Sequence, residues 1–285
     1  MLTAKHRELF ITNAKGNELF VDQYFLSPES PNLIFCCTPI VTVTDFEVCY
    51  KPFAEKGFNV FALDFAGVGK SAGSMKNFSA RGIVEDFDAL LSHICNNYGK
   101  YVFLFGDTGT GGIFAQHYAA VRNDVTALAQ YGICIPGDTS PLKSSAGLLR
   151  IMHGMLSLSG KLLPQIQLPF TVPAYDGYNA ERDNRFYARL REENPAMFRV
   201  HVNFMTTLMG MFLGKNGVTE KDIAVPTLVF KTLHDRYYPP EYFDKYYARL
   251  NCAKRLVEIN DVHNSYYFYP ERIAADVADW FMRHM

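Results

Sequence analysis

A glycine-rich segment in the first half of the chain constrains the fold more than any other feature. Residues 101–105 are all apolar or aromatic, and the turn Gly-Asp-Thr-Gly-Thr-Gly of residues 106–111 follows them directly. Residues 113–120 then have the pattern of a helix. Because glycine lacks a side chain, it allows the backbones of a strand and a helix to approach closely. The segment therefore predicts a buried strand, a sharp turn and a helix.

Such a turn is typical of the nucleophile elbow, in which the pattern Gly-x-Ser-x-Gly holds a hydroxyl at the top of a sheet. The register that starts at the first glycine puts Thr108 in the place of the serine, and we favour this register. A second register makes Asp107 the nucleophile, but the large Phe105 then occupies a position that needs a small residue. If the glycine pair of the helix sets the register, Gly109 takes the nucleophile position and the site is inactive.

The overall composition narrows the range of partners. The 285 residues are 48% hydrophobic, which is enough for one large domain with a full core. The net charge is −1 and no Lys/Arg cluster stands out, so we expect neither nucleic acid nor an anionic membrane surface as a partner. No run of about 18 apolar residues predicts a membrane span, and the charged N-terminus does not resemble a signal peptide.

The six cysteines have no C-x-x-C spacing, and Cys36, Cys37 and Cys134 lie in apolar, strand-like runs. This pattern favours buried, reduced thiols in a cytoplasmic protein over disulfides or a metal site. We expect no cofactor. The sequence does not specify an oligomeric state.

Apolar strand-like runs alternate with helical patterns along most of the chain. This alternation predicts the α/β class, with a mostly parallel central sheet covered by helices on both faces. A hairpin of residues 7–13 and 17–25 precedes the parallel strands, and Ser79 is the expected N-cap of a helix over residues 79–98. The remaining expected strands are Leu33–Cys37, Phe58–Asp64, Val125–Ile133, Thr227–Phe230 and Arg255–Ile259.

Residues 138–220 interrupt the alternation. They contain helical stretches at 145–159 and 198–213 around a segment rich in Pro and Tyr. We therefore predict a core of residues 1–137 and 221–285 with a helical cap of residues 138–220. Flexible thioethers suit an adaptable apolar pocket, so we expect the side of the cap rich in Met and Leu to face that pocket. Six of the ten methionines lie in the cap, namely Met152, Met155, Met197, Met205, Met209 and Met211.

A hydroxyl nucleophile needs a base, and the base needs an acid that orients it. Asp235 follows the strand over residues 227–230, and His263 follows the strand over residues 255–259. Catalytic groups in open α/β sheets gather at the carboxyl ends of strands, which suits both residues and the elbow. An oxyanion hole needs two N–H groups, which we expect from Gly109 and Ile40 because Pro39 has none to give.

Residues 33–114 and 225–285 resemble the α/β-hydrolase superfamily, in particular its monoacylglycerol lipase, lysophospholipase and serine aminopeptidase-like members. The stretch Phe61-Ala-Leu-Asp-Phe-Ala-Gly-Val-Gly-Lys-Ser-Ala-Gly73 is similar to the family pattern Asp-x-Arg-Gly-x-Gly-x-Ser-x-Gly. The segments around Asp235 and His263 are similar to the family's acid and His loops. Thr38-Pro39 replaces the usual His-Gly, Ala66 the usual Arg and Thr108 the serine.

These features predict a hydrolase or acyl transferase that acts on a small-molecule ester, thioester or amide with an apolar acyl group. Thr108 attacks, His263 acts as base and Asp235 orients it. One alternative is a binding protein that kept the fold and lost the nucleophile. Another is an enzyme in which Asp107 attacks or His263 transfers protons without a covalent intermediate.

Overall fold

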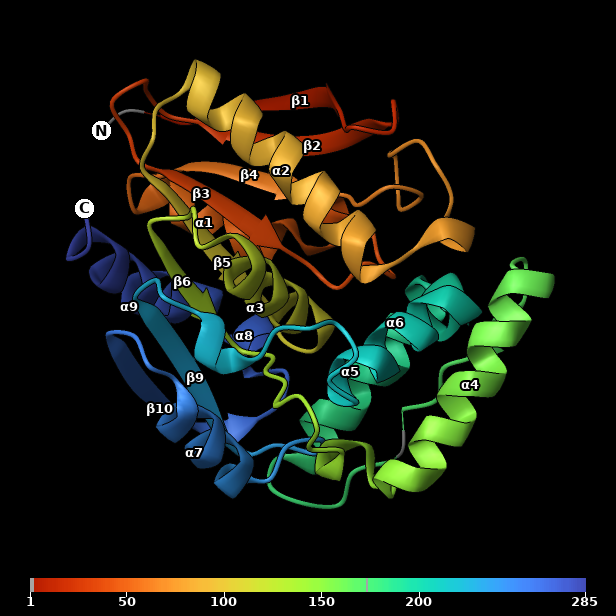
Figure 1. Cartoon of the computed structure of the whole chain (residues 1–285). Coiled ribbons are helices and arrows are strands. Elements are labelled where there is room, and N and C mark those ends of the chain that lie inside the picture. The colour runs from red at the N-terminus through yellow and green to blue at the C-terminus, as the bar shows by residue number, and fades with distance from the viewer. Residues whose placement is uncertain (1–2, 173) are drawn as a thin grey trace.

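The computed structural model, which describes residues 3–172 and 174–285, is built on a sheet in the order β1-β2-β4-β3-β5-β6-β9-β10 (Figure 1). The pairings β1–β2 and β2–β4 are antiparallel, and the other pairings in this sheet are parallel. The predicted α/β class with a mostly parallel sheet is confirmed. The strands are β1 (Lys5–Thr12), β2 (Glu18–Phe25), β3 (Asn32–Cys36), β4 (Asn59–Leu63), β5 (Val102–Gly106), β6 (Ala127–Gln130), β9 (Thr227–His234) and β10 (Lys254–Val262).

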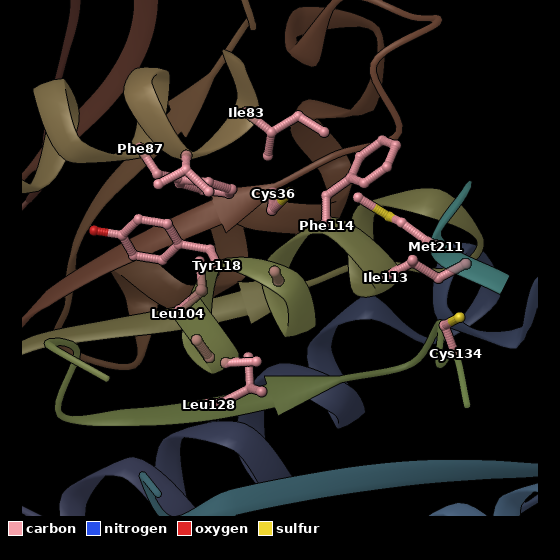
Figure 2. Packing of buried hydrophobic residues seen from close by; sticks show 14 of the residues in the cluster. Cys36, Ile83, Phe87, Leu104, Ile113, Phe114, Tyr118, Leu128, Cys134 and Met211 are labelled. Atoms are coloured by element: carbon pink, nitrogen blue, oxygen red, sulfur yellow. The ribbon is translucent and has the colours of Figure 1, made fainter. Parts of the chain in front are cut away.

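Helices cover both faces of this sheet, so the side chains of its central strands are buried on both sides, whereas the edge strand β1 is mostly exposed. On one face, α2 (Ala80–Asn97) and α3 (Thr110–Arg122) pack Phe87 and Tyr118 against Leu104 of β5 (Figure 2). On the other face, Phe53 of α1 (Glu47–Glu55) packs against Phe105 of the same strand, and Phe281 of α9 (Pro270–Met282) packs against Phe103. Strands β3, β4 and β5 are completely buried, as expected for apolar runs in a parallel sheet.

The expected strands are present, but several boundaries differ, since β9 extends to His234 and β10 to Val262. Ser79 caps α2, since its hydroxyl accepts the N–H of Gly82 at 3.1 Å. Strand β6, however, ends at Gln130 instead of Ile133. A side chain at Gly132 would overlap the carbonyl of Gly109, so the chain after β6 must pass close under the turn that follows β5. This contact interrupts the strand.

Residues 138–220 lie beyond the carboxyl ends of the parallel strands and are mainly helical (Figure 1). They contain α4 (Ala146–Leu162), α5 (Ala180–Glu193) and α6 (Val202–Phe212), with a small antiparallel pair of β7 (Gln167–Pro169) and β8 (Arg199–His201). We infer that these residues form the expected cap. Helix α5 was not expected, because its charged sequence lacks the apolar run that marks α4 and α6.

Shorter helices complete the path of the chain. Helix α7 (Pro240–Arg249) follows β9, and α8 (Ser265–Phe268) follows β10. In the part of the chain that the structure describes, no helix has both the length and the apolar character needed to cross a membrane.

Candidate active site

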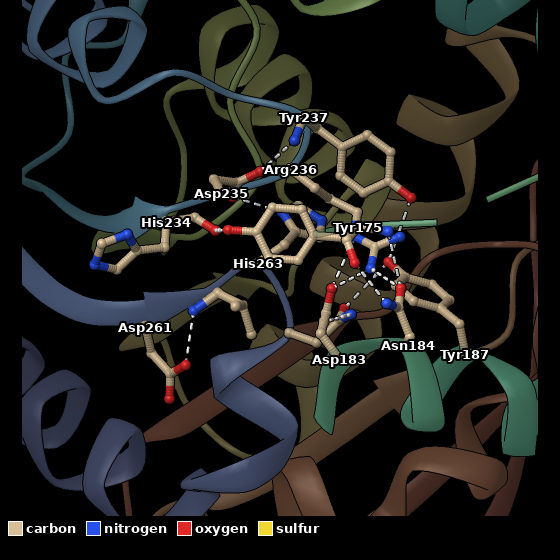
Figure 3. Close-up of polar contacts among 12 residues, drawn as sticks. Tyr175, Asp183, Asn184, Tyr187, His234, Asp235, Arg236, Tyr237, Asp261 and His263 are labelled. Carbon is tan, nitrogen blue, oxygen red and sulfur yellow. Dashed lines mark hydrogen bonds and ion pairs between the residues drawn. The ribbon is translucent and has the colours of Figure 1, made fainter. Parts of the chain in front are cut away.

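The predicted acid and base lie side by side after β9 and β10 (Figure 3). His263 Nδ1 is 2.7 Å from Asp235 Oδ2, which also accepts the hydroxyl of Thr232 at 2.6 Å. The other carboxylate oxygen accepts the N–H groups of Tyr237 and Tyr238 at 2.8 and 3.0 Å. With both oxygens fixed in this way, the carboxylate holds the imidazole in one orientation and leaves Nε2 free to act on a substrate.

The electrostatics of the pair favour an ionised acid. Burial by itself raises the pKa of Asp235, whose side chain is only 1% exposed. The attraction to His263 and the hydrogen bonds from His263, Thr232 and the N–H of Tyr238 outweigh burial, so the pKa of Asp235 lies below its ordinary value. The carboxylate is therefore charged at neutral pH.

The turn after β5 has its strained backbone conformation at Gly109, with φ 70° and ψ −130°, and α3 begins at the next residue. In a nucleophile elbow the nucleophile holds the strained position between strand and helix. A Cβ built on Gly109 would lie 3.9 Å from His263 Nε2, and its nearest neighbour would be Thr38 Oγ1 at 3.6 Å. A side chain at Gly109 would therefore point at the imidazole, with room to do so.

Close approaches within the turn agree with this register. The elbow needs small residues two positions before and after the nucleophile, because these positions touch each other. A Cβ on Gly111 would overlap the carboxyl of Asp107, so residues 107 and 111 are such a pair around Gly109. Glycine at 111 leaves room for the larger Asp107.

Thr108, predicted as the nucleophile, precedes the strained position. Its hydroxyl interacts with the phenol of Tyr267, and its carbonyl accepts the hydroxyl of Thr38 at 3.3 Å. Among the residues that the structure describes, no hydrogen bond joins Thr108 to His263, although both line the same cavity. The nucleophilic role of Thr108 stays a prediction, and the backbone favours the third register that the sequence left open.

Asp107, the alternative nucleophile, lies beneath the turn. Its side chain is completely buried, accepts the hydroxyl of Tyr267 at 3.2 Å and does not line the cavity. Burial raises the pKa of Asp107 to about 7, although hydrogen bonds from Cys37, Tyr267 and the N–H of Thr38 lower it. A carboxyl that cannot reach a ligand in the cavity cannot attack it. The alternative prediction that Asp107 is the nucleophile is therefore corrected, and we assign this residue a structural role.

This carboxyl leads to a prediction for stability. Because its folded pKa of about 7 exceeds the ordinary 3.8, the native state binds the proton more tightly than the unfolded state does. The free energy of unfolding should therefore fall as pH rises from about 4 to about 7, by roughly 1.4 kcal/mol for each unit of the shift. Asp107→Asn should remove this slope, as measured by urea unfolding of both proteins across the range. Parallel curves for the two proteins would contradict the assignment.

The oxyanion hole differs from the predicted one. Ile40 donates its N–H to the carbonyl of Thr38 at 2.8 Å, and the N–H of Thr38 is directed to Asp107. Ile40 therefore lines the cavity without a free donor, which corrects its predicted role. The N–H of the residue after the nucleophile is one donor of the oxyanion hole. If Gly109 holds the nucleophile position, this donor is the N–H of Thr110 instead of the expected N–H of Gly109. The N–H of Thr110 opens α3 and has no acceptor within the helix.

An apolar cavity of about 230 Å³ opens above Gly109 and His263. The cap lines it with Phe186 and Leu190 of α5 and with Phe204 of α6. Aromatic residues dominate the wall of the cavity. Of the six methionines predicted to line it, only Met197 and Met205 do so. Met209 and Met211 are buried elsewhere, and Met152 and Met155 are exposed on α4. The methionine part of the prediction was therefore wrong for four of the six residues, whereas Leu142, Leu190 and Leu208 of the cap line the cavity as expected.

One cap residue connects the segments that carry the acid and the base. Asp183 of α5 is fully buried and accepts Arg236 Nε at 2.8 Å and Asn264 Nδ2 at 3.0 Å (Figure 3). Arg236 follows Asp235 in the chain, and Asn264 follows His263. A single carboxylate therefore fixes both loops to the cap. Sequence reasoning missed it, because nothing in the charged α5 distinguishes Asp183 from its neighbours.

Asp183→Asn should destabilise the protein by about 3–5 kcal/mol, because it leaves the buried guanidinium of Arg236 without its carboxylate. Glu181→Gln is the matched control. It removes an exposed ion pair with Arg185 on the same helix, which is worth at most about 1 kcal/mol. Equal changes in denaturant midpoint for the two variants would show that the buried pair does not hold the cap.

Comparisons with known proteins agree with this architecture. A family model described as serine aminopeptidase, S33, matches residues 42–263. No curated protein matches the sequence. The solved structures that are similar include DcsB in complex with its substrate analogue, with a TM-score of 0.75 and 17% identity over 99% of this chain and 100% of that one.

Two further structures are similar over nearly the whole chain. A monoacylglycerol lipase from Paleococcus ferrophilus has a TM-score of 0.71 and 18% identity over 94% of this chain and 100% of the lipase. The thioesterase domain from the curacin biosynthetic pathway has a TM-score of 0.66 and 17% identity over 98% and 99% of the two chains. At these identities the structures establish the fold alone, whereas the family model covers more than half of the chain. The protein therefore belongs to the serine aminopeptidase S33 family of hydrolases, within the α/β-hydrolase superfamily.

Proposed function

We propose that this protein hydrolyses an ester or thioester with an apolar acyl group, and that His263 activates water to attack in place of a side chain. The observation that carries the proposal is the geometry at Gly109. A nucleophilic side chain at position 109 would fill a space that faces His263 Nε2. Because residue 109 is glycine, no side chain fills this space. A water molecule in that space can donate a hydrogen bond to the imidazole.

The proposed reaction follows from the orientation of the dyad. His263 Nε2 removes a proton from water while the hydroxide oxygen bonds to the acyl carbon and the carbonyl oxygen becomes an oxyanion. The bond to the leaving oxygen or sulfur then breaks, and the proton on His263 passes to the leaving group. Asp235 stabilises the imidazolium between these steps. No acyl-enzyme forms, because the attacking atom does not belong to the protein.

One group is already placed for the oxyanion, and a second can turn to it. The N–H of Thr110 lies at the start of α3, where the helix dipole favours negative charge. The hydroxyl of Thr38 is 3.6 Å from the Cβ position of residue 109, and it becomes the second donor when it rotates away from the carbonyl of Thr108 that accepts its proton in this structure. The aromatic cavity supports the assignment of an apolar acyl group, since it offers few polar partners for a hydrophilic one.

The test of this proposal compares wild type with Thr108→Ala on p-nitrophenyl esters and acyl thioesters of increasing chain length. We expect Thr108→Ala to keep kcat within about tenfold of wild type, because the hydroxyl only neighbours the site. If Thr108 attacks instead, as the sequence register predicts, the same change should abolish turnover, since loss of a nucleophile removes many orders of magnitude.

A second candidate function is a binding protein without turnover, which the missing side chain at Gly109 favours. Such a protein would bind apolar acyl compounds in the cavity and release them unchanged. The esters and thioesters that test the hydrolase also test this alternative. Saturable binding without product over the whole series would support the binder and exclude the hydrolase.

A further inference from the structure

Helix α4 carries a continuous apolar face that no part of the described chain covers. It lies at the periphery of the cap, with α6 as its neighbour (Figure 1). Seven large apolar residues of α4 and the residue after it are between 39% and 69% exposed. They are Leu148, Ile151, Met152, Met155, Leu158, Leu162 and Leu163.

The spacing of these residues is that of one helical face. Steps of three and four residues bring them onto a single stripe along the helix. The opposite side of α4 is the packed one, where Leu149 is 3% exposed and Gly160 lies against Asn203 of α6. The apolar stripe is therefore a second, outward face and does not belong to the hydrophobic core.

The charged residues of the segment that carries the stripe all have one sign. Residues 139–175 contain Lys143, Arg150 and Lys161 and no Asp or Glu. All three cations are exposed, and Lys215 lies beside α4 through its contact with His153. The net charge of the whole chain is −1, so it does not reveal the local excess of positive charge on this segment. For this reason the overall composition did not predict an anionic membrane surface as a partner.

We propose that α4 binds the surface of an anionic lipid bilayer, with its apolar stripe among the acyl chains and its cations at the headgroups. An exposed apolar stripe with flanking Lys and Arg is the pattern of a helix that lies in the membrane interface. Charge complementarity selects this occupant, because a second copy of the chain would bring the same cations together without an acidic residue in the segment to pair with them. The binding does not depend on the proposed hydrolysis and is measured without turnover.

The experiment is co-sedimentation of the full chain with vesicles of phosphatidylcholine alone or mixed with phosphatidylglycerol. We expect binding to the mixed vesicles that weakens as salt is added. Ile151→Gln/Met155→Gln should weaken this binding at least tenfold, because two apolar side chains no longer enter the bilayer. Arg150→Gln/Lys161→Gln should remove the preference for the anionic vesicles.

Tyr101→Gln is the matched control, since Tyr101 is 55% exposed and precedes β5 at the end of the sheet opposite the cap. It should bind vesicles like wild type. Absence of wild-type binding to either vesicle would overturn the proposal, and so would equal loss in the control and the α4 variants. A dimer in light scattering that Ile151→Gln/Met155→Gln converts to monomer would also overturn it, because a second copy would then cover the stripe.

Discussion

Gly109→Ser is expected to give this protein a nucleophile that fluorophosphonates label. The new Cβ would lie 3.9 Å from His263 Nε2, so its hydroxyl can reach the imidazole that Asp235 orients. The backbone already has the conformation of an elbow nucleophile, and Thr110 supplies the following N–H. We expect labelling to change from undetectable to stoichiometric, and ester turnover to rise by roughly 10²–10³ if the triad is restored.

Gly109→Ala is the control for Gly109→Ser, because it adds a side chain at position 109 without a hydroxyl. Both variants place a Cβ at a positive φ, which costs about 1–3 kcal/mol, so both should unfold at a lower denaturant concentration than wild type. The methyl of alanine also fills the space assigned to water, so turnover should fall while labelling stays absent. Labelling of Gly109→Ala, or of wild type at Thr108, would show that the nucleophile lies elsewhere in the turn.

His263→Ala is expected to lower kcat by about 10²–10⁴, the usual contribution of a general base. Binding of a non-hydrolysable apolar ketone in the cavity should change little, because the walls come mainly from aromatic and aliphatic side chains of other elements. His234→Ala is the control. His234 is adjacent to Asp235 but stacks on Tyr178 outside the cavity, so its loss should leave kcat near wild type.

The two histidine variants also separate catalysis from folding. If His263→Ala and His234→Ala reduce kcat equally, the dyad does not act as a base. If His263→Ala abolishes ketone binding along with turnover, the ring shapes the cavity more than it transfers protons.

The sequence specified the topology better than the chemistry. Apolar runs and their alternation with helices are local signals, and they placed β3, β4, β5 and β9 close to their observed positions. The order of strands then brought Asp235 and His263 together, because the carboxyl ends of neighbouring parallel strands meet at one edge.

The register of the elbow, in contrast, depends on contacts between distant segments. Residues 106–112 contain four glycines, so the sequence offered a small residue for more than one register. The structure distinguishes them through the positive φ of Gly109 and the approach of Gly132 to its carbonyl. The oxyanion donor at Ile40 failed for a similar reason, since the turn at Thr38 that occupies its N–H leaves no sequence signal.

The most direct test of the account is intact-protein mass spectrometry of wild type quenched during steady turnover of a p-nitrophenyl ester. Direct attack by water predicts product release with no acyl mass on the protein, whereas Gly109→Ser should carry one acyl group under the same conditions. An acyl adduct on wild type, mapped to Thr108 in the peptide that spans the elbow, would contradict the account.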